Sequence, residues 1–322
     1  MVEHQSPESR NQHSLSVLRF GLSPVVGEEA IGRAVALARG AQTALLFVGR
    51  NGEWDGEGLD RTNIDLPHRQ NELISRVAAA NKNTVVVLQS GGPVAMPWLD
   101  QVAAVIQAWY PGQEAGNSIA DVLLGKAEPG GRLPQTFPRR LEDDPAFINY
   151  PGEGGHVRYG EGLYVGYRYY EKKKIEPLFP FGFGLSYTQF RFGALALSAG
   201  TIGPGETVEA SIEVANVGDR EGSAVVQFYV ADDEASVSRP GKELKRFVKA
   251  RLKPGEKRTI ITTFDMRCLA FFDVASRSWK AEPGRFTVMA GSSSADSHGQ
   301  ASFALTGAWI DDGPRLGTTK SA

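Results

Sequence analysis

The segment of this chain best suited to chemistry is a short loop that carries a carboxyl group between two glycines. Glu57 stands between Gly56 and Gly58 in the run Trp54-Asp55-Gly56-Glu57-Gly58-Leu59-Asp60-Arg61. Because glycine has no Cβ, the backbone can bend there and a ligand can approach the carboxyl group closely. The indole of Trp54 could stack on the apolar C–H face of a sugar ring. These residue types suit a ligand-binding loop, and sugar chemistry in particular.

The elements around this loop are those expected of an open α/β sheet. Residues 44–48 form an apolar run that predicts a buried strand before the loop, and Pro67 is expected to open a helix after it. In open α/β sheets, ligands bind outside the carboxyl ends of the strands. A Gly-Glu-Gly triplet is a weak signal by itself, since the chain has two more, around Glu153 and Glu161. The position of Glu57 after a strand is what makes it the strongest candidate.

Helix and strand patterns alternate through the first part of the chain. Apolar residues at helical spacing predict helices at 28–39, from 67 onward and at 114–124. Apolar runs predict strands at 44–48, 84–88 and 104–108. This alternation indicates an α/β sandwich, with a mostly parallel sheet and flanking helices.

The pattern changes twice after residue 130. Residues 130–186 are rich in Pro, Gly and aromatic residues and are expected to form loops and short strands that wrap the sheet. Beyond residue 190, alternating apolar and polar residues predict strands at 208–214, 224–230, 258–264, 285–290 and 300–305. Short strands separated by turns are typical of an antiparallel sandwich. A chain of 322 residues also suits two domains better than one. We expect the boundary between residues 186 and 194.

Composition and charge exclude several classes of protein. The net charge of −2 provides no basic surface for nucleic acid or an anionic membrane, and no apolar run is long enough to cross a bilayer. Cys268 is the sole cysteine, so no intrachain disulfide can form. The five histidines have no metal-ligand spacing. We expect no metal and no cofactor. Localisation is open, with the cytoplasm favoured because no signal segment is seen and cysteine is scarce.

The sequence motifs of several other enzyme classes are absent or incomplete. Gly91-Gly92-Pro93 follows a strand as a phosphate loop would, but no Lys-Ser/Thr follows, and proline removes an amide donor. No Gly-x-Gly-x-x-Gly opens a helix, and no Gly-x-Ser-x-Gly elbow occurs. A nucleotide site and a serine hydrolase are therefore disfavoured.

Five segments of the sequence, in order, resemble glycoside hydrolase family 3, and its β-glucosidases in particular. They are the loop at 54–61 with Asp65-Leu66-Pro67, and the segments at 108–114, 129–138, 161–170 and 180–187. The resemblance covers the chain from about Leu22 to its end. It implies a tail or linker at 1–20, an α/β sandwich domain at 21–190, and an all-β fibronectin type III-like (immunoglobulin-like) sandwich at 191–322.

The resemblance is to only part of that family's architecture. Family members begin with a β/α barrel, which carries the nucleophilic aspartate in a Ser-Asp-Trp-like motif, and no such motif occurs here. Retaining glycosidases need two carboxyl groups, one as nucleophile and one as acid and then base. The resemblance implies that Glu57 is the general acid/base of a retaining, exo-acting enzyme that releases terminal β-D-glucose.

The residues near Glu57 are assigned separately. We expect Trp54 and Asp55 to bind substrate, and Asp60 and Arg61 to hold the loop through an ion pair or through bonds to backbone amides. Purely structural roles stay open for all three residues. Glu57 could cap a turn, Trp54 could pack in the core, and Asp55 could form a turn. Glu161 precedes a strand-like aromatic run and is interpreted as structural. Glu153 could line the entrance to the site without doing chemistry.

Two further functions remain open at this stage. A non-catalytic carbohydrate- or protein-binding module would explain the missing barrel motif, which should also leave apolar loops exposed around Glu57. A β-xylosidase of the same family is the other option. The expected partners are a β-glucoside or oligosaccharide substrate, and either a separate barrel-domain chain or a second copy of this chain.

Overall fold

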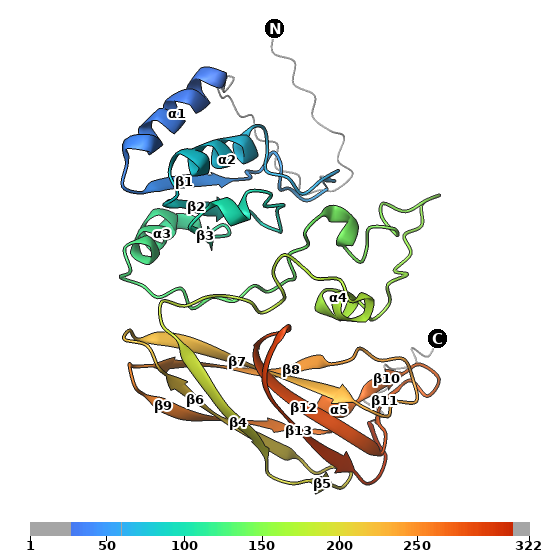
Figure 1. Cartoon of the computed structure of the whole chain (residues 1–322). Coiled ribbons are helices and arrows are strands. Elements are labelled where there is room, and N and C mark those ends of the chain that lie inside the picture. Colours follow the sequence, from blue (N-terminus) through green and yellow to red (C-terminus); the bar gives the residue numbers. More distant parts are fainter. Residues whose placement is uncertain (1–26, 59, 312–322) are drawn as a thin grey trace.

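The computed structural model describes residues 27–58 and 60–311 (Figure 1). The predicted tail at 1–20 lies outside the described residues. The chain forms an α/β part and a β-sandwich, and the segment between them crosses from one to the other. Both expected fold classes are confirmed.

The α/β part is built on a small parallel sheet. Its strands are β1 (Ala44–Gly49), β2 (Thr84–Gln89) and β3 (Ala104–Gln107), in the order β1-β2-β3. Val86, Val87 and Leu88 of the central strand are fully buried, as a continuous apolar run predicts for a strand covered on both faces. The parallel register places the carboxyl ends of all three strands at one edge.

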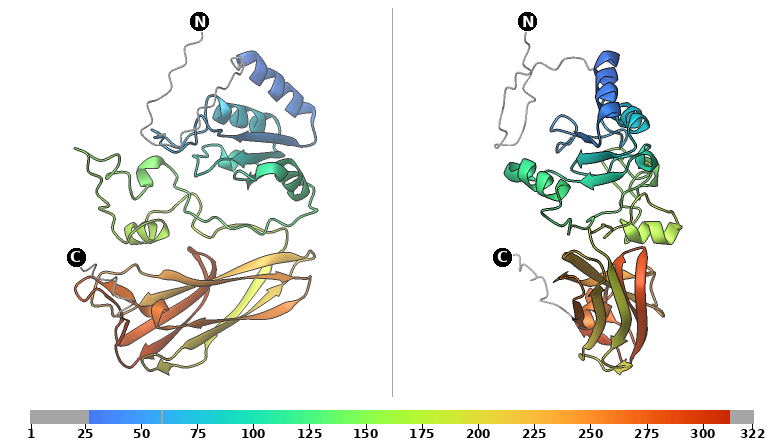
Figure 2. Two further views of the ribbon diagram at one scale, coloured as in Figure 1. Left: turned by 180° about the vertical axis from the view of Figure 1, so that it is seen from behind. Right: turned by 60° about the vertical axis from the view of Figure 1, so that its left-hand side comes forward.

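Helices cover the two faces of the sheet unequally (Figure 2). On one face, α2 (Gln70–Ala80) packs with Ile74, Val77 and Ala78, and α1 (Glu28–Gly40) lies against α2 near the β1 edge. On the other face lies α3 (Ala115–Leu123), preceded by the 3-10 turn η2 (Gly112–Glu114). Another 3-10 turn, η1 (Leu99–Gln101), precedes β3.

The second helix begins later than the sequence indicated. Pro67 was expected to open it, but α2 starts at Gln70. His68 has a φ of 55°, which lies outside the α-helical region, so the chain turns once more before the helix can begin. This turn brings the His68 imidazole against Trp54 of the glutamate loop.

The connecting segment contains a helix where the sequence suggested a strand-like run. The 3-10 turn η3 (Leu141–Asp143) is followed by α4 (Tyr167–Lys173). Tyr167 and Tyr170 are three residues apart, so a helix turns both rings inward: Tyr170 is buried, and Tyr167 contacts the ring of Phe181. Among the described residues of this segment, strand character is limited to two isolated bridges, Phe137–Phe179 and Glu153–His156.

The C-terminal part is a sandwich of two sheets around one apolar core. One sheet has the order β5-β13-β12-β7-β8 and the other β4-β6-β9. The strands are β4 (Phe190–Leu197), β5 (Thr201–Ile202), β6 (Val208–Asn216), β7 (Gly222–Asp232), β8 (Glu243–Leu252), β9 (Lys257–Phe264), β12 (Gly284–Ser293) and β13 (Asp296–Leu305). A short helix, α5 (Met266–Leu269), and a small sheet of β10 (Phe271–Asp273), β11 (Ser278–Ala281) and β14 (Trp309–Asp311) complete it.

The predicted strands are those with a clear buried face. In β6, Val208, Ala210 and Ile212 point into the core, as their alternation predicts. The sequence missed the short strands β5, β10, β11 and β14 and two long ones, β4 and β8, which both lie at sheet edges. The sequence of β8 carries Lys245, Arg246 and Lys249, and charged side chains on an edge strand discourage unwanted pairing. Such an edge strand loses the simple apolar alternation by which strands are recognised.

Polar contacts lock the connecting segment onto the sandwich. The buried Gln227 of β7 donates hydrogen bonds to the carbonyl oxygens of Gly182 (3.0 Å) and Ser292 (2.7 Å). Arg168 of α4 forms an ion pair with Glu243 of β8 at 2.9 Å. The first strand of the sandwich, β4, begins at Phe190. No helix in the described ranges is long and apolar enough to span a membrane.

Candidate active site

The loops that follow the three parallel strands meet around the carboxylate of Asp55. Asp55 follows β1, Gly91 follows β2 and Tyr110 follows β3. One carboxylate oxygen of Asp55, Oδ2, accepts hydrogen bonds from the Gly91 amide (2.8 Å) and the Tyr110 hydroxyl (2.7 Å). A single side chain therefore joins three strand ends, at the sheet edge where ligands bind in this class of fold.

The other oxygen of Asp55 faces two arginines. Arg61 Nη1 donates to Oδ1 at 3.1 Å, and Arg50 Nη1 forms an ion pair with the same oxygen at 3.6 Å. The Arg50 side chain is 1% exposed and also donates to the Asp65 carbonyl oxygen at 2.8 Å. Both Asp55 oxygens thus already accept bonds from the protein.

This network keeps Asp55 ionised. Burial works to raise the pKa of the Asp55 carboxyl, but the hydrogen bonds from Tyr110 and Gly91, together with Arg61 and Arg50, outweigh it and lower the pKa. Burial, followed by the hydrogen bond to Asp55, raises the pKa of Tyr110 to about 12. The phenol of Tyr110 therefore stays protonated at neutral pH and donates a hydrogen bond to the Asp55 carboxylate.

Glu57 stands in the open on the loop that Asp55 anchors. It lies in a turn and is exposed, and no side chain among the described residues bonds its carboxyl group. It lines a pocket of about 320 Å³. The pocket walls are Trp54, Asp55, Gly56, Glu57, Arg61, Gly91 and Tyr110. Three of the sequence-predicted site residues, Trp54, Asp55 and Glu57, are thus brought together.

Trp54 is a rim residue of this pocket. Its side chain is 41% exposed, so the alternative of a core position does not hold. The His68 ring contacts it edge-on, with the ring centroids 5.5 Å apart and the ring planes at 81°. An indole held by one neighbour, with much of its surface open, can offer a face to a sugar ring.

Asp60 and Arg61 hold the loop, though each has a different partner. Arg61 binds Asp55, whereas Asp60 accepts a hydrogen bond from the Tyr150 hydroxyl. Tyr150 belongs to the connecting segment, so the loop is tied to a second part of the chain. The sequence offered no signal for Tyr150, because its pairing spans 90 residues.

The two competing glutamates lie elsewhere. Glu161 accepts a hydrogen bond from the Asn149 amide at 2.8 Å, which agrees with a structural role. Glu153 pairs with His156 through the backbone in a tight turn. Neither lines the pocket of Glu57.

The sequence reasoning missed Tyr110, Gly91 and Arg50 as parts of this site. A usable signal existed for two of them, since Gly91 and Tyr110 each come shortly after a predicted strand. A Cβ on Gly91 would lie 3.1 Å from the Tyr110 ring and 3.3 Å from Asp55 Oδ2, so a side chain there would crowd both groups. Trp109, with a φ of 56°, turns its ring onto Phe137, while the next residue reaches the pocket. In the part of the chain that the structure covers, no cluster of His, Cys, Asp and Glu is arranged to hold a metal.

Two family models match this chain, one in each part of the fold. Residues 4–187 match the glycosyl hydrolase family 3 C-terminal domain, and residues 224–294 match the fibronectin type III-like domain. The chain belongs to glycosyl hydrolase family 3.

The relatives of this chain are consistent in name. It is 48% identical over 310 residues to a β-glucosidase of Rhizobium radiobacter, covering 95% of this chain and 38% of that protein. It is 44% identical over 271 residues to thermostable β-glucosidase B of Acetivibrio thermocellus, covering 84% and 36% respectively. The crystal structure of the Kluyveromyces marxianus β-glucosidase in complex with glucose superposes with a TM-score of 0.86 at 43% identity, covering 90% of this chain and 35% of that one. The chain thus spans little more than a third of the length of these relatives.

Proposed function

We propose that this chain supplies the general acid/base of a retaining, exo-acting β-glucosidase, and that Glu57 is that residue. The observation that carries the proposal is an exposed carboxyl group beside an open indole, on a loop anchored at the carboxyl edge of the sheet. Membership of glycosyl hydrolase family 3 and relatives named β-glucosidase support the substrate class.

The second carboxylate of the reaction must come from outside this pocket. Among the described residues that line it, Asp55 is the only other carboxylate. Both of its oxygens accept bonds from protein donors, two of them guanidinium groups, and this leaves it a poor nucleophile. Retaining hydrolysis needs a free carboxylate about 5–5.5 Å from the acid. We assign that role to the barrel that the family resemblance implies, in the part of such proteins that this chain does not span.

Asp55 is better suited to positioning than to binding sugar. A hydrogen bond from a sugar hydroxyl, as the sequence suggested, would displace one of the present donors. We propose instead that Asp55 holds the loop so that Glu57 and Trp54 face the same space. Trp54 then supports the sugar ring, and Glu57 protonates the departing oxygen and later deprotonates water.

The test is a complementation assay. The chain is combined with the barrel part of a family member, and hydrolysis of aryl β-glucosides is followed. Glu57→Gln should lower kcat about 10²–10⁴-fold for a poor leaving group, and much less for 2,4-dinitrophenol, which needs no proton. The matched control is Glu153→Gln, which also changes an exposed glutamate between two glycines. Equal rates for Glu57→Gln and Glu153→Gln would refute the assignment.

One observation favours a second candidate, a module that binds protein without catalysis. The connecting segment exposes a group of large apolar side chains: Phe147, Ile148, Tyr150, Val157, Tyr159, Leu163 and Val165. Exposed apolar patches mark interaction surfaces, and Tyr150 ties this one to the glutamate loop. Under the main proposal, the barrel docks here. Titration of the chain with the barrel part separates the two, since binding of the barrel without turnover of an aryl β-glucoside would favour the module.

A β-xylosidase is the remaining alternative. Substrate choice in the proposed enzyme would depend mainly on groups outside this chain, because the pocket here offers only one wall to a sugar. Comparison of aryl β-glucoside and aryl β-xyloside in the complemented assay decides between them. The relatives named β-glucosidase lead us to expect the glucoside to react faster.

A further inference from the structure

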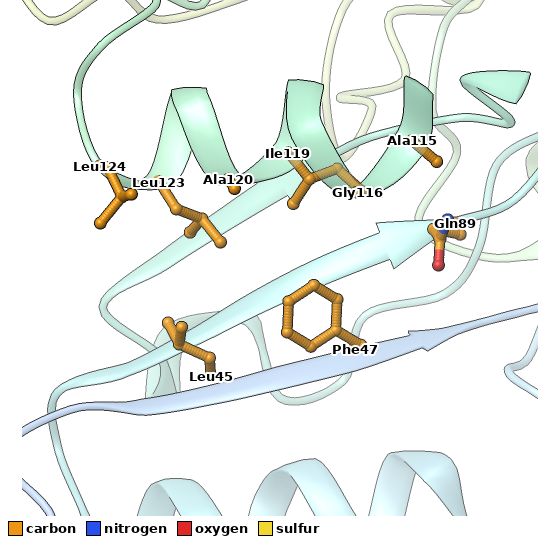
Figure 3. Close-up of a pocket in the computed structure, with 9 residues that line it drawn as sticks. All are labelled: Leu45, Phe47, Gln89, Ala115, Gly116, Ile119, Ala120, Leu123 and Leu124. Carbon is orange, nitrogen blue, oxygen red and sulfur yellow. The ribbon is translucent and has the colours of Figure 1, made fainter. Parts of the chain in front are cut away.

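The described residues form an apolar groove of about 480 Å³ between β1 and α3 (Figure 3). Gln89 is the one polar side chain among its lining residues, and none of them is ionisable. No residue lines both this groove and the pocket of Glu57. The groups that orient a substrate beside Glu57 therefore belong to its own pocket and to the residues that hold the pocket rim.

The backbone of the rim residue Trp54 is fixed by the turn that leads to it. The amides of Trp54 and Asp55 both donate hydrogen bonds to the Asn51 carbonyl oxygen, at 2.9 Å each. Gly56 and Gly58, on the other side, have no side chains that could pack against the indole. The direction of the indole is therefore set from outside the turn. Its one ring–ring contact among the described residues is with His68.

His68 stands between two anchored residues. Pro67 before it is buried. Two positions after it, the side chain of Gln70 binds the end of β1: Nε2 donates to the Gly49 carbonyl oxygen at 2.9 Å, and Oε1 accepts from the Gly49 amide at 2.8 Å. The imidazole thus projects from a backbone that is tied to the strand leading into the glutamate loop.

The backbone conformation of His68 is itself uncommon. Its φ of 55° lies in the left-handed region, which residues with a Cβ seldom adopt. Among the described residues, only three other non-glycine residues have a positive φ, and one of them, Trp109, directly precedes Tyr110 of the pocket. Unfavourable backbone geometry is often retained at functional sites, where the surrounding structure holds it. At His68 this geometry brings the imidazole to Trp54.

We propose that His68 is a positioning residue of this site, which sets the direction of the Trp54 indole so that one face of the indole meets a sugar ring of the substrate. The inference rests on the proposed function of the Glu57 pocket and adds a residue to it. Stacking of a sugar on the indole is equally present in the ground state and the transition state. Its loss therefore weakens binding without slowing the chemical step, so the effect of His68 belongs in KM.

The test compares His68→Asn with His68→Phe in the complemented enzyme, with an aryl β-glucoside as substrate. Asn removes the ring and still accepts a left-handed backbone, whereas Phe keeps an aromatic ring at some cost in backbone strain. We expect KM to rise about 3–10-fold for His68→Asn, the equivalent of one lost aromatic contact, with kcat nearly unchanged. His68→Phe should return KM to within about two-fold of the unaltered value.

The matched control is Arg277→Asn. It also places Asn at a positive φ, 53°, but in the turn between β10 and β11 of the sandwich, so KM should not change. A double-variant cycle shows whether His68 acts through Trp54. In a Trp54→Ala background, His68→Asn should raise KM no further, because the ring that it directs is already gone. An unchanged KM for His68→Asn, or the same increase in the Trp54→Ala background, would overturn the proposal.

Fluorine NMR of the full chain labelled with fluorotryptophan measures the contact without a partner. The chain has five tryptophans, and the Trp54 signal is identified by its loss in Trp54→Phe. His68→Asn should move the Trp54 signal and leave the others in place, and an unmoved signal would refute the proposal.

Failure of the proposed function gives a different result. A complemented Glu57→Gln variant with full activity, or a complemented chain without turnover, would refute the acid/base role. The role of His68 is then decided by the Kd for glucose, followed through the Trp54 fluorine signal in the presence of the barrel part. We expect this Kd to be about 3–10-fold weaker in His68→Asn. An equal Kd, or no response of Trp54 to glucose, would overturn the positioning role.

Discussion

The hydroxyl of Tyr110 donates a hydrogen bond to the Asp55 carboxylate at 2.7 Å, across 55 residues of sequence. The amide of Gly91, in the loop after the central strand β2, donates to the same oxygen. The glutamate loop is therefore fixed by the ends of neighbouring strands rather than by its own sequence. Four predictions follow from this arrangement and from the packing of the two parts of the chain.

Tyr110→Phe should loosen the glutamate loop while leaving the ring in place. The change removes one hydrogen bond to a charged acceptor, so we expect a loss of about 1.5–3 kcal/mol in the free energy of unfolding. In the complemented enzyme kcat should fall more than KM changes, because Glu57 loses its position and not its ligand. Urea titration and aryl glucoside kinetics measure the two effects. Tyr159→Phe, an 81% exposed tyrosine far from the pocket lining, is the control. An unchanged kcat in Tyr110→Phe would contradict the positioning role of the network.

Low pH should reduce the stability of the folded chain, because Asp55 becomes protonated. Its folded-state pKa is lowered below the ordinary 3.8, since the bonds from Tyr110, Gly91 and the arginines outweigh burial. The stabilisation is therefore fully present above pH 3.8 and is lost as the pH falls through the folded-state pKa. Asp55→Asn, which cannot ionise, should be less stable at pH 7 by about 1.5–3 kcal/mol, the value of a hydrogen bond to a charged group, and this difference should narrow below pH 3.8.

Urea midpoints at several pH values measure this difference. Asp219→Asn, a change at an exposed turn, serves as the control and should track the unaltered chain at every pH. A gap between Asp55→Asn and the unaltered chain that stays constant down to pH 2 would mean that the network does not depend on the charge of Asp55.

Gly91→Ala should disturb the site more than the neighbouring Gly92→Ala. The added Cβ at Gly91 would lie 3.1 Å from the Tyr110 ring and 3.3 Å from Asp55 Oδ2. The Cβ at Gly92 meets only the Arg61 guanidinium, at an ordinary 3.5 Å. We expect a lower kcat for Gly91→Ala, with a stability cost of about 1–3 kcal/mol for overpacking, and little effect for Gly92→Ala. Equal kinetics for the two variants would show that the close approach is not needed.

Gly182→Ala should weaken the joint between the connecting segment and the sandwich. Gly182 has a φ of 80°, and a Cβ there would lie 2.2 Å from Gln227 Oε1. Gln227 is held by bonds to Gly182, Ser292 and Tyr229, so it cannot move aside freely. Gly205→Ala isolates the backbone strain, because Gly205 has a φ of 85° and open space around it.

The two glycine variants should therefore differ in thermal stability. Gly205→Ala should cost about 1–2 kcal/mol from the left-handed backbone alone, and Gly182→Ala should cost distinctly more because the clash adds to it. Scanning calorimetry measures both. Identical melting temperatures would mean that Gln227 does not lock the two parts together.

Much of the fold could be read from local patterns. The runs at 44–48 and 84–88 predicted β1 and β2, and the alternation at 208–214 predicted β6. These predictions succeeded because the apolar residues of a strand are visible directly in the sequence. The motif around Glu57 likewise indicated the family and the most interesting loop. Prediction from periodicity failed where the apolar residues do not mark a single buried face. This happened at the edge strand β8 and at the aromatic run near Tyr167, which forms a helix.

The sequence by itself determined the helices and strands with one clear apolar face, and that Glu57 stands on a loop after a strand. Only the tertiary structure decided that Asp55 joins that loop to Gly91 and Tyr110, and that Asp60 pairs with Tyr150. The physical reason is that periodicity is a local property, recorded within a few residues. Hydrogen-bond partners and uncovered surface depend instead on which distant segments the folded chain brings together.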